Sequence, residues 1–250
     1  MFKFVTGIIA TATLAVAAPA LADPITLDAG DVGTTFSIDL NGFVDNSGNV
    51  VDGLGATLTF TLEETDGGSY TFSYVVDNTT DSGVTSNISS FAFNVDPDIS
   101  GAAVDGAYQY SFVADGRGSD PSYPNQVGQV DVCFKARNSG SCSNGGGVAE
   151  GQSGTGTLTL FFDPDASQIT LSDFFVRYQG ITGAGNVGSA TGESTTSTTT
   201  GGIPPGGSTT TGTPVPAPGV LGLLALALAS LGFMRRRRSG GPSSAQPAYA

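Results

Sequence analysis

The residue types that could carry out chemistry are few in this chain, and one type is missing. Histidine is absent, which removes Ser-His-Asp and Cys-His nucleophile systems and metal sites built on imidazole. A catalyst would have to work with carboxylates alone, as glycoside hydrolases do. Most of the 22 acidic residues fall in Gly, Asn and Pro turns, where aspartate forms local backbone hydrogen bonds. No spacing pairs two of them as acid and nucleophile, so we expect no enzymatic activity.

Aspartate-rich turns are the candidates for metal binding, because Ca²⁺ prefers carboxylate and carbonyl oxygens. The pairs are Asp96 with Asp98 and Asp163 with Asp165, each around a proline. They match neither the EF-hand spacing nor the glycine nonapeptide repeat of calcium-binding β-rolls, and solvated turns account for them as well. We expect no cofactor, with calcium as the alternative.

Cys133 and Cys142 are the only cysteines. Reactive or metal-binding thiols are one alternative, but the sequence supplies no partner residues for them. In an exported chain, two cysteines at this separation close a disulfide-bonded loop that stabilises the fold by about 2–3 kcal/mol. We therefore expect a structural disulfide.

The elements that must position these residues have a period of two. Polar and apolar residues alternate, with Thr, Val and aromatic residues enriched, and Gly, Asn and Asp clusters lie between the runs. This pattern predicts an all-β domain over residues 23–183, an antiparallel two-sheet β-sandwich of jelly-roll or immunoglobulin-like type; a closed barrel is the alternative. The expected strands are Thr57–Leu62, Tyr70–Val75, Ser90–Val95, Tyr108–Phe112, Gln129–Phe134, Thr157–Phe161, Ile169–Leu171 and Phe174–Tyr178.

Tyrosines at these alternating positions have two interpretations. As exposed platforms they could stack sugars in a carbohydrate-binding module, although such modules commonly use Trp, which is absent. As inward-facing residues they would belong to the core or to cross-strand pairs. The residues concerned are Tyr108, Tyr110, Tyr123 and Tyr178.

The charge of the chain is strongly acidic. The net charge is −13, and between residues 23 and 193 the 22 acidic residues face only four basic ones, Arg117, Lys135, Arg137 and Arg177, which gives −18. Such a surface repels nucleic-acid phosphates and anionic lipids. We expect no nucleic-acid partner.

The first 22 residues have the pattern of a secretory signal peptide. Lys3 supplies the positive charge, an apolar run follows, and Ala20 and Ala22 supply the small residues of the cleavage site. Asp23-Pro24 comes next and disfavours a continued helix. The sequence predicts export by the Sec route.

The other end of the chain has three parts. Residues 184–213 are rich in Thr, Ser and Gly and predict a flexible linker, with O-glycosylation as a sharper alternative. Residues 214–238 contain Pro216-Ala217-Pro218, fifteen apolar residues from Val220 to Met234 and four arginines. As a helix the apolar run spans roughly 22 Å and would be short for a membrane anchor. The cluster of Arg235, Arg236, Arg237 and Arg238 should stay on the cytoplasmic side with the tail 239–250, leaving the N-terminus outside.

This ending resembles the PEP-CTERM sorting signal of Gram-negative bacteria, with Ala217 where the family usually has Glu. The extension after Arg238 also departs from the family pattern. Ser90–Asp98 and Leu171–Tyr178 are similar to the cistern family of PEP-CTERM proteins. The resemblance implies a transient inner-membrane anchor, cleavage by an exosortase-type membrane protease, and release to the cell surface or extracellular matrix. It also implies a structural role associated with biofilm and exopolysaccharide, while a lectin-like carbohydrate-binding module is the alternative.

Overall fold

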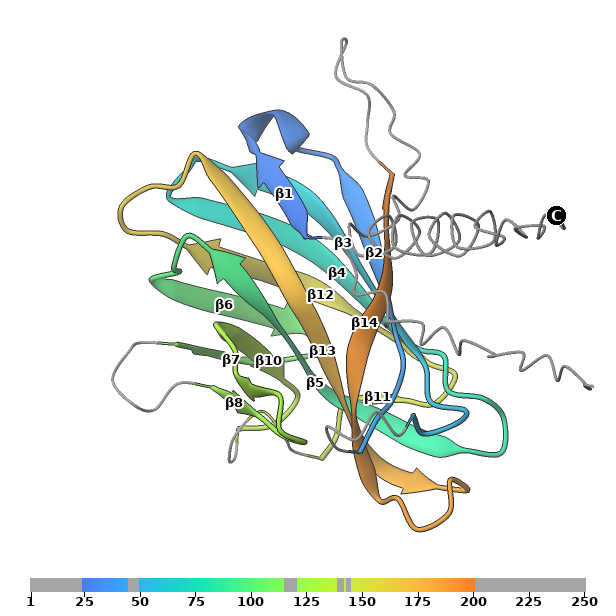
Figure 1. Cartoon of the computed structure of the whole chain (residues 1–250). Coiled ribbons are helices and arrows are strands. Elements are labelled where there is room, and N and C mark those ends of the chain that lie inside the picture. The colour runs from blue at the N-terminus through green and yellow to red at the C-terminus, as the bar shows by residue number, and fades with distance from the viewer. Residues whose placement is uncertain (1–23, 45–49, 115–120, 139–141, 143–144, 201–250) are drawn as a thin grey trace, which may run out of the picture. The chain divides into compact units, whose positions relative to one another are not determined.

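The computed structural model describes residues 24–44, 50–114, 121–138, 142 and 145–200, and in these residues the secondary structure is strands with one short 3₁₀ helix (Figure 1). The all-β prediction is confirmed at this level. The elements are β1 (Ile25–Asp28), η1 (Ala29–Asp31), β2 (Thr35–Leu40), β3 (Ala56–Thr65), β4 (Ser69–Asn78), β5 (Thr85–Asp96), β6 (Gly101–Gly106), β7 (Tyr110–Val113), β8 (Ser122–Tyr123), β9 (Gly128–Gln129), β10 (Val132–Lys135), β11 (Val148–Ala149), β12 (Ser153–Phe161), β13 (Gln168–Thr182) and β14 (Ser189–Thr200).

Apart from β8 and β9, which pair with each other in a separate two-stranded sheet, the strands form one nearly closed, barrel-like antiparallel sheet. Its order is β6-β12-β4-β3-β2-β14-β13-β5-β10-β7, with β1 on β13 and β11 on β5. Strand β14 makes the sheet continuous, because residues 189–193 pair with β13 and residues 194–200 pair with β2. The two edge strands meet where the Ser111 hydroxyl of β7 donates to the Ala102 carbonyl of β6 at 2.6 Å. The two-sheet sandwich is therefore not confirmed.

One aromatic core fills the space enclosed by the sheet. Inward-facing residues of β2, β3 and β4 meet those of β5 and β13, and the strict alternation of β3 and β4 places every second side chain inside. The Phe60 ring lies 6.0 Å from the rings of Phe91, Phe93 and Phe174. The core thus connects strands that are far apart along the sheet. The rings meet in tilted and edge-on arrangements, which are favourable for aromatic pairs.

The linker prediction is wrong over part of its length. Residues 189–200 are not a flexible segment but the strand β14, seen in orange in Figure 1. The error has a physical cause: Thr and Ser satisfy the backbone geometry of a strand without supplying the apolar alternation that marks one. The paired region therefore extends beyond residue 183, to Thr200.

Several predictions fall on residues outside those that the structure describes. These are the signal peptide with Ala20 and Ala22, the remainder of the linker, the motif Pro216-Ala217-Pro218, the apolar helix, the arginine cluster and the tail 239–250. Within the described ranges, no helix is long and apolar enough to cross a membrane.

Candidate functional site

The outward side of β14, β2, β3, β4 and β12 is an array of hydroxyl groups, which we call the hydroxyl face. The alternation that sends apolar residues into the core sends Thr and Ser outward from five adjacent strands. The hydroxyl face consists of Thr196, Thr198, Thr200, Thr35, Ser37, Thr57, Thr59, Thr61, Thr71, Ser73, Ser153, Thr155, Thr157 and Thr159, together with Asp39, Val75 and Asp77.

The strand register aligns these side chains in rows that run across the sheet. One row consists of five hydroxyl residues from five strands, Thr200, Thr35, Thr61, Ser73 and Thr157. Several neighbours along the rows are hydrogen-bonded, with 2.8 Å between the hydroxyls of Thr35 and Thr61 and 3.0 Å between those of Thr71 and Thr159. These cross-strand pairs hold the side chains in fixed positions.

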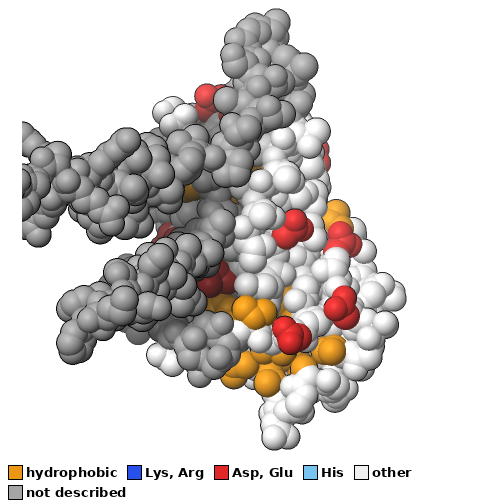
Figure 2. All heavy atoms as spheres, turned by 45° about the vertical axis from the view of Figure 1, so that its right-hand side comes forward, with side chains coloured by type: hydrophobic (Ala, Val, Ile, Leu, Met, Phe, Trp, Pro, Cys, Tyr) orange, Lys and Arg blue, Asp and Glu red, His pale blue; other side chains and the backbone are white. Residues whose placement is uncertain are grey.

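The paired hydroxyls keep further hydrogen-bonding capacity toward solvent. A hydroxyl has one donor and two acceptor sites, so one bond between two hydroxyls uses one donor and one acceptor and leaves the second donor free. On the side of the molecule turned forward in Figure 2, the described atoms include scattered Asp and Glu and show no Lys or Arg. The hydroxyl face can therefore form many hydrogen bonds with a partner, but it has no basic side chain to pair with an anionic partner.

The opposite half of the sheet has a covered outer side. Residues 121–130, which contain β8 and β9 and are called the cover segment here, lie against β5, β10 and β13. Tyr123 and Val130 of this segment pack with Ala92, Cys133 and Cys142 in a second apolar cluster, separate from the main core. The outward side of these strands is thus a small second core rather than a solvated surface.

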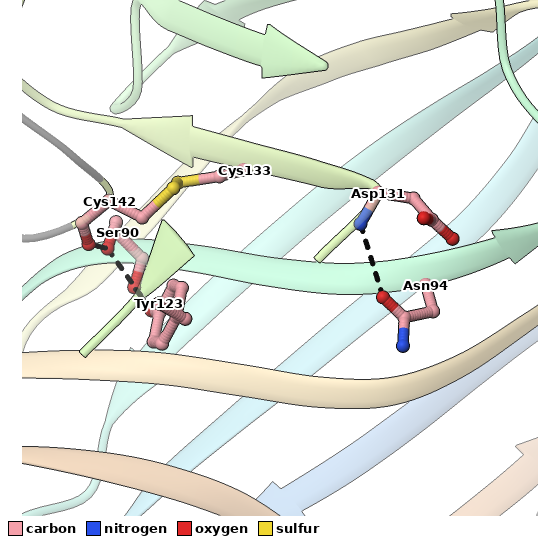
Figure 3. The surroundings of a disulfide bond; sticks show 6 residues. All are labelled: Ser90, Asn94, Tyr123, Asp131, Cys133 and Cys142. Atoms are coloured by element: carbon pink, nitrogen blue, oxygen red, sulfur yellow. Dashed lines mark hydrogen bonds between the residues drawn. A yellow bond between two sulfur atoms is a disulfide. The ribbon is translucent and has the colours of Figure 1, made fainter. Parts of the chain in front are cut away.

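The predicted disulfide is confirmed and lies inside this cluster. Cys133 and Cys142 are joined, with 6.1 Å between their Cα atoms, and both are buried (Figure 3). The Ser90 hydroxyl donates to the Cys142 carbonyl at 2.5 Å. The Tyr123 hydroxyl donates to the Ser90 carbonyl at 3.1 Å, and burial raises the pKa of Tyr123 well above its ordinary value. The hydrogen bonds between Tyr123 and Ser90 attach the cover segment to β5, and the disulfide packs in the same cluster.

Two of the four basic residues of the acidic region are buried in one row of the covered side. Lys135 of β10 and Arg177 of β13 both pair with Ser90 of β5. The Arg177 guanidinium donates to the hydroxyls of Ser189 at 2.7 Å and Thr191 at 3.3 Å, while its Nε has no partner among the described residues. Burial lowers the pKa of both cations, and Lys135 also lies 4.4 Å from the centre of the Phe112 ring. The surface is therefore more acidic than the composition suggests.

A hollow of about 310 Å³ lies at the border of the covered side. Of its three acidic residues, Asp96 was a predicted calcium candidate, whereas Asp131 and Asp173 were not among the predicted site residues. Asn94 is bonded to two of them: its Nδ2 donates to the Asp173 carboxylate at 3.0 Å, and its Oδ1 accepts from the Asp131 amide at 3.2 Å. The Asp131 carboxylate accepts from the Val95 amide at 2.8 Å. Desolvation, reinforced by Asp173, raises the pKa of Glu193 nearby. Asp131, directly before β10, and Asp173, within β13, lie outside the aspartate-rich turns that the sequence analysis singled out.

The calcium candidates lie at two turns. Asp96 ends β5 and Asp98 follows it, whereas Asp163 and Asp165 lie between β12 and β13 beside the β3–β4 turn. Among the described residues, no three acidic, Cys or His side chains gather closely enough to hold a metal ion. Calcium binding at these residues stays an untested prediction.

The tyrosines proposed as sugar platforms are mostly inside the protein. Tyr108 and Tyr178 are buried in the main core and Tyr123 in the second apolar cluster, while Tyr110 is half-buried at the edge strand β7. The core interpretation is therefore confirmed for three of the four. Exposed aromatic stacking is excluded for these three, so any sugar contact would have to use other groups.

Comparison with known proteins gives no relative from which a function could be transferred: no family model matches the chain, and no curated protein or solved structure shows significant similarity to it.

Proposed function

We propose that this chain is an exported, exosortase-processed surface or extracellular-matrix protein of a Gram-negative bacterium. Its role would be structural, associated with biofilm and exopolysaccharide, and non-enzymatic. In this proposal the domain is a rigid module with two sandwich-like layers, one formed around β3 and β4 and the other around β5 and β13.

The observation that carries the proposal is the buried disulfide between Cys133 and Cys142. Disulfides form and persist in oxidising compartments outside the cytoplasm, so this bond supports the export expected from the signal-peptide pattern. The PEP-CTERM-like ending then supplies the second half of the route, a temporary inner-membrane anchor with the N-terminus outside. The disulfide and the PEP-CTERM-like ending are independent of each other, and both support a location outside the cytoplasm.

A carbohydrate-binding module remains the second candidate, and the hydroxyl face is the observation that favours it. Since Tyr108, Tyr123 and Tyr178 are buried, the module would bind through hydrogen bonds rather than through stacking. A structural protein should cause matrix defects on deletion without discrete sugar affinity, whereas a binding module should show that affinity in the purified state.

The experiment that tests the proposal is intact-mass measurement of the protein from envelope and culture fractions. We expect a mature form that begins near Asp23, retains the disulfide and ends close to Pro216-Ala217-Pro218. An intact cluster Arg235–Arg238 on most molecules would reject processing and leave a permanent anchor. An uncleaved N-terminus with free thiols would reject export itself.

A further inference from the structure

One row of the hydroxyl face alternates hydroxyl and carboxylate groups. The strand register places Thr196 of β14, Asp39 of β2, Thr57 of β3, Asp77 of β4 and Ser153 of β12 side by side. All five side chains are exposed or partly exposed. We call these five residues the alternating row.

The hydroxyls hold both carboxylates in place. The Asp39 carboxylate accepts from Thr57 at 2.9 Å through one oxygen and from Thr196 at 3.1 Å through the other. The Asp77 carboxylate accepts from the Ser153 hydroxyl. Because an ionised carboxylate has about four acceptor sites, both groups can accept further hydrogen bonds from a partner.

The spacing of the carboxylates follows from the sheet. Asp39 and Asp77 lie two strands apart with Thr57 between them, and two strand spacings amount to about 9–10 Å. This distance is comparable with the length of a disaccharide unit in an extended polysaccharide. A polysaccharide that crosses the strands along the alternating row would meet its two carboxylates about one disaccharide unit apart.

The charge of the domain selects the sign of the partner. Of the basic residues that the structure describes, Lys135 and Arg177 are buried on the covered side and only Arg137 is exposed. The alternating row itself contains two acidic residues and no basic one. An anionic polymer would be repelled, whereas a cationic one would be attracted and oriented by the carboxylates.

The geometry points to a polymer of amino sugars with free amines as the ligand of the alternating row. Its ammonium groups bind Asp39 and Asp77, and its hydroxyls hydrogen-bond with Thr57, Thr196 and Ser153. The twist between adjacent strands, about 20–25°, allows a rigid flat surface to touch only a few strands at a time, whereas a flexible polysaccharide can follow the row. This inference rests on the proposed exported location, where such a polymer is encountered.

The test is titration calorimetry on the full-length protein in mild detergent, near physiological ionic strength. The probes are a fully deacetylated glucosamine oligomer long enough to span the five strands and its N-acetylated counterpart. We expect binding of the deacetylated oligomer only. The double variant Asp39→Asn/Asp77→Asn should weaken this binding about tenfold, since two exposed charge contacts are lost.

The matched control is Asp163→Asn/Asp165→Asn, which removes the same charge from exposed residues outside the hydroxyl face. We expect this control to bind nearly as tightly as the unchanged protein. Equal weakening by the two double variants would show diffuse attraction and overturn the inference, as would equal binding of the N-acetylated oligomer or no binding at all. The mature form's mass and location do not enter this test, so the inference and the proposed function can fail separately.

Discussion

The two outer sides of this one sheet are built in opposite ways. Around β2, β3 and β4 the outward positions carry Thr, Ser and Asp, and the surface is open to solvent. Around β5 and β10 the outward positions include Ala92 and Cys133, and the cover segment buries them. The same strand geometry thus gives a solvated surface of hydroxyl groups in one half and a second core in the other.

The difference shows that the outward-facing residues of a strand decide whether its outer side must be buried by another segment. A hydroxyl is satisfied by its cross-strand neighbour and by water, whereas an outward Ala, Cys or Phe leaves apolar area that only another segment can remove from water. On the covered side this segment is held by the hydrogen bond between Tyr123 and Ser90 and by packing against the disulfide-bonded cysteines. The following predictions test how far the two halves differ.

The largest expected effect is the difference in the free energy of unfolding between the variants Tyr123→Ala and Thr59→Ala. Tyr123 is buried and bonded to Ser90, so its truncation should lower the free energy of unfolding by about 3–5 kcal/mol. Thr59 lies on the open hydroxyl face and its hydroxyl is hydrogen-bonded to that of Ser37, so its truncation should cost about 1 kcal/mol or less. Urea unfolding of both variants measures the difference, and similar losses would show that the hydroxyl face is not solvated.

Loss of the disulfide should come next in size. Cys133→Ala/Cys142→Ala opens a loop with a sequence separation of 9, which should cost about 2–3 kcal/mol. Hydrogen exchange should then rise in β10 and in the cover segment while β3 and β4 stay protected. Reductant should destabilise the unchanged protein but not the double variant, and uniform loss of protection across both halves would contradict the separation.

Arg177→Met should stabilise the protein. The guanidinium is buried with hydroxyl partners only and one unbonded nitrogen among the described residues, so replacing it with an apolar chain of similar length removes a desolvation cost. We expect a gain of about 1 kcal/mol in urea unfolding at neutral pH. A loss of similar size would show that a counter-charge pairs with Arg177.

The smallest effect concerns Glu193 and depends on pH. Desolvation and Asp173 raise the pKa of Glu193, so its protonated form favours folding and this contribution is lost as the pH rises through the raised pKa. Glu193→Gln should therefore raise the melting temperature by about 2–4 °C or less at pH 7. Below the ordinary glutamate pKa of about 4.3 the difference should vanish. A larger difference in acid than at pH 7 would contradict this assignment.

The sequence predicted the strands whose two sides differ. Thr57–Leu62 and Tyr70–Val75 lie in β3 and β4, where apolar and polar residues alternate because one side is the core and the other is solvent. The disulfide was also predictable, since Cys133 and Cys142 are the only cysteines. Local pattern was sufficient in each case.

The alternation of polar and apolar residues did not predict strands whose two sides are both polar, nor burial that depends on contacts with residues distant in the sequence. Strand β14 has almost no apolar residues, so its pairing with β2, more than 150 residues earlier, gave no periodic signal. In the same way, Tyr123 alternates like a strand residue, yet its burial depends on Ser90 and on the disulfide. Strand β14 connects the two halves of the sheet. Without predicting this strand, the sequence could not decide between a sandwich and a barrel.

Strand β14 is the element on which the hydroxyl face depends most, since it adds Thr196, Thr198 and Thr200 and joins the two halves. Hydrogen exchange with mass spectrometry, resolved over residues 189–200, tests it most directly. The structure predicts slow exchange across this segment, comparable with β2 and β13. Exchange as fast as that of an unstructured chain would show that residues 189–200 are the flexible linker first expected, and would remove one edge of the hydroxyl face.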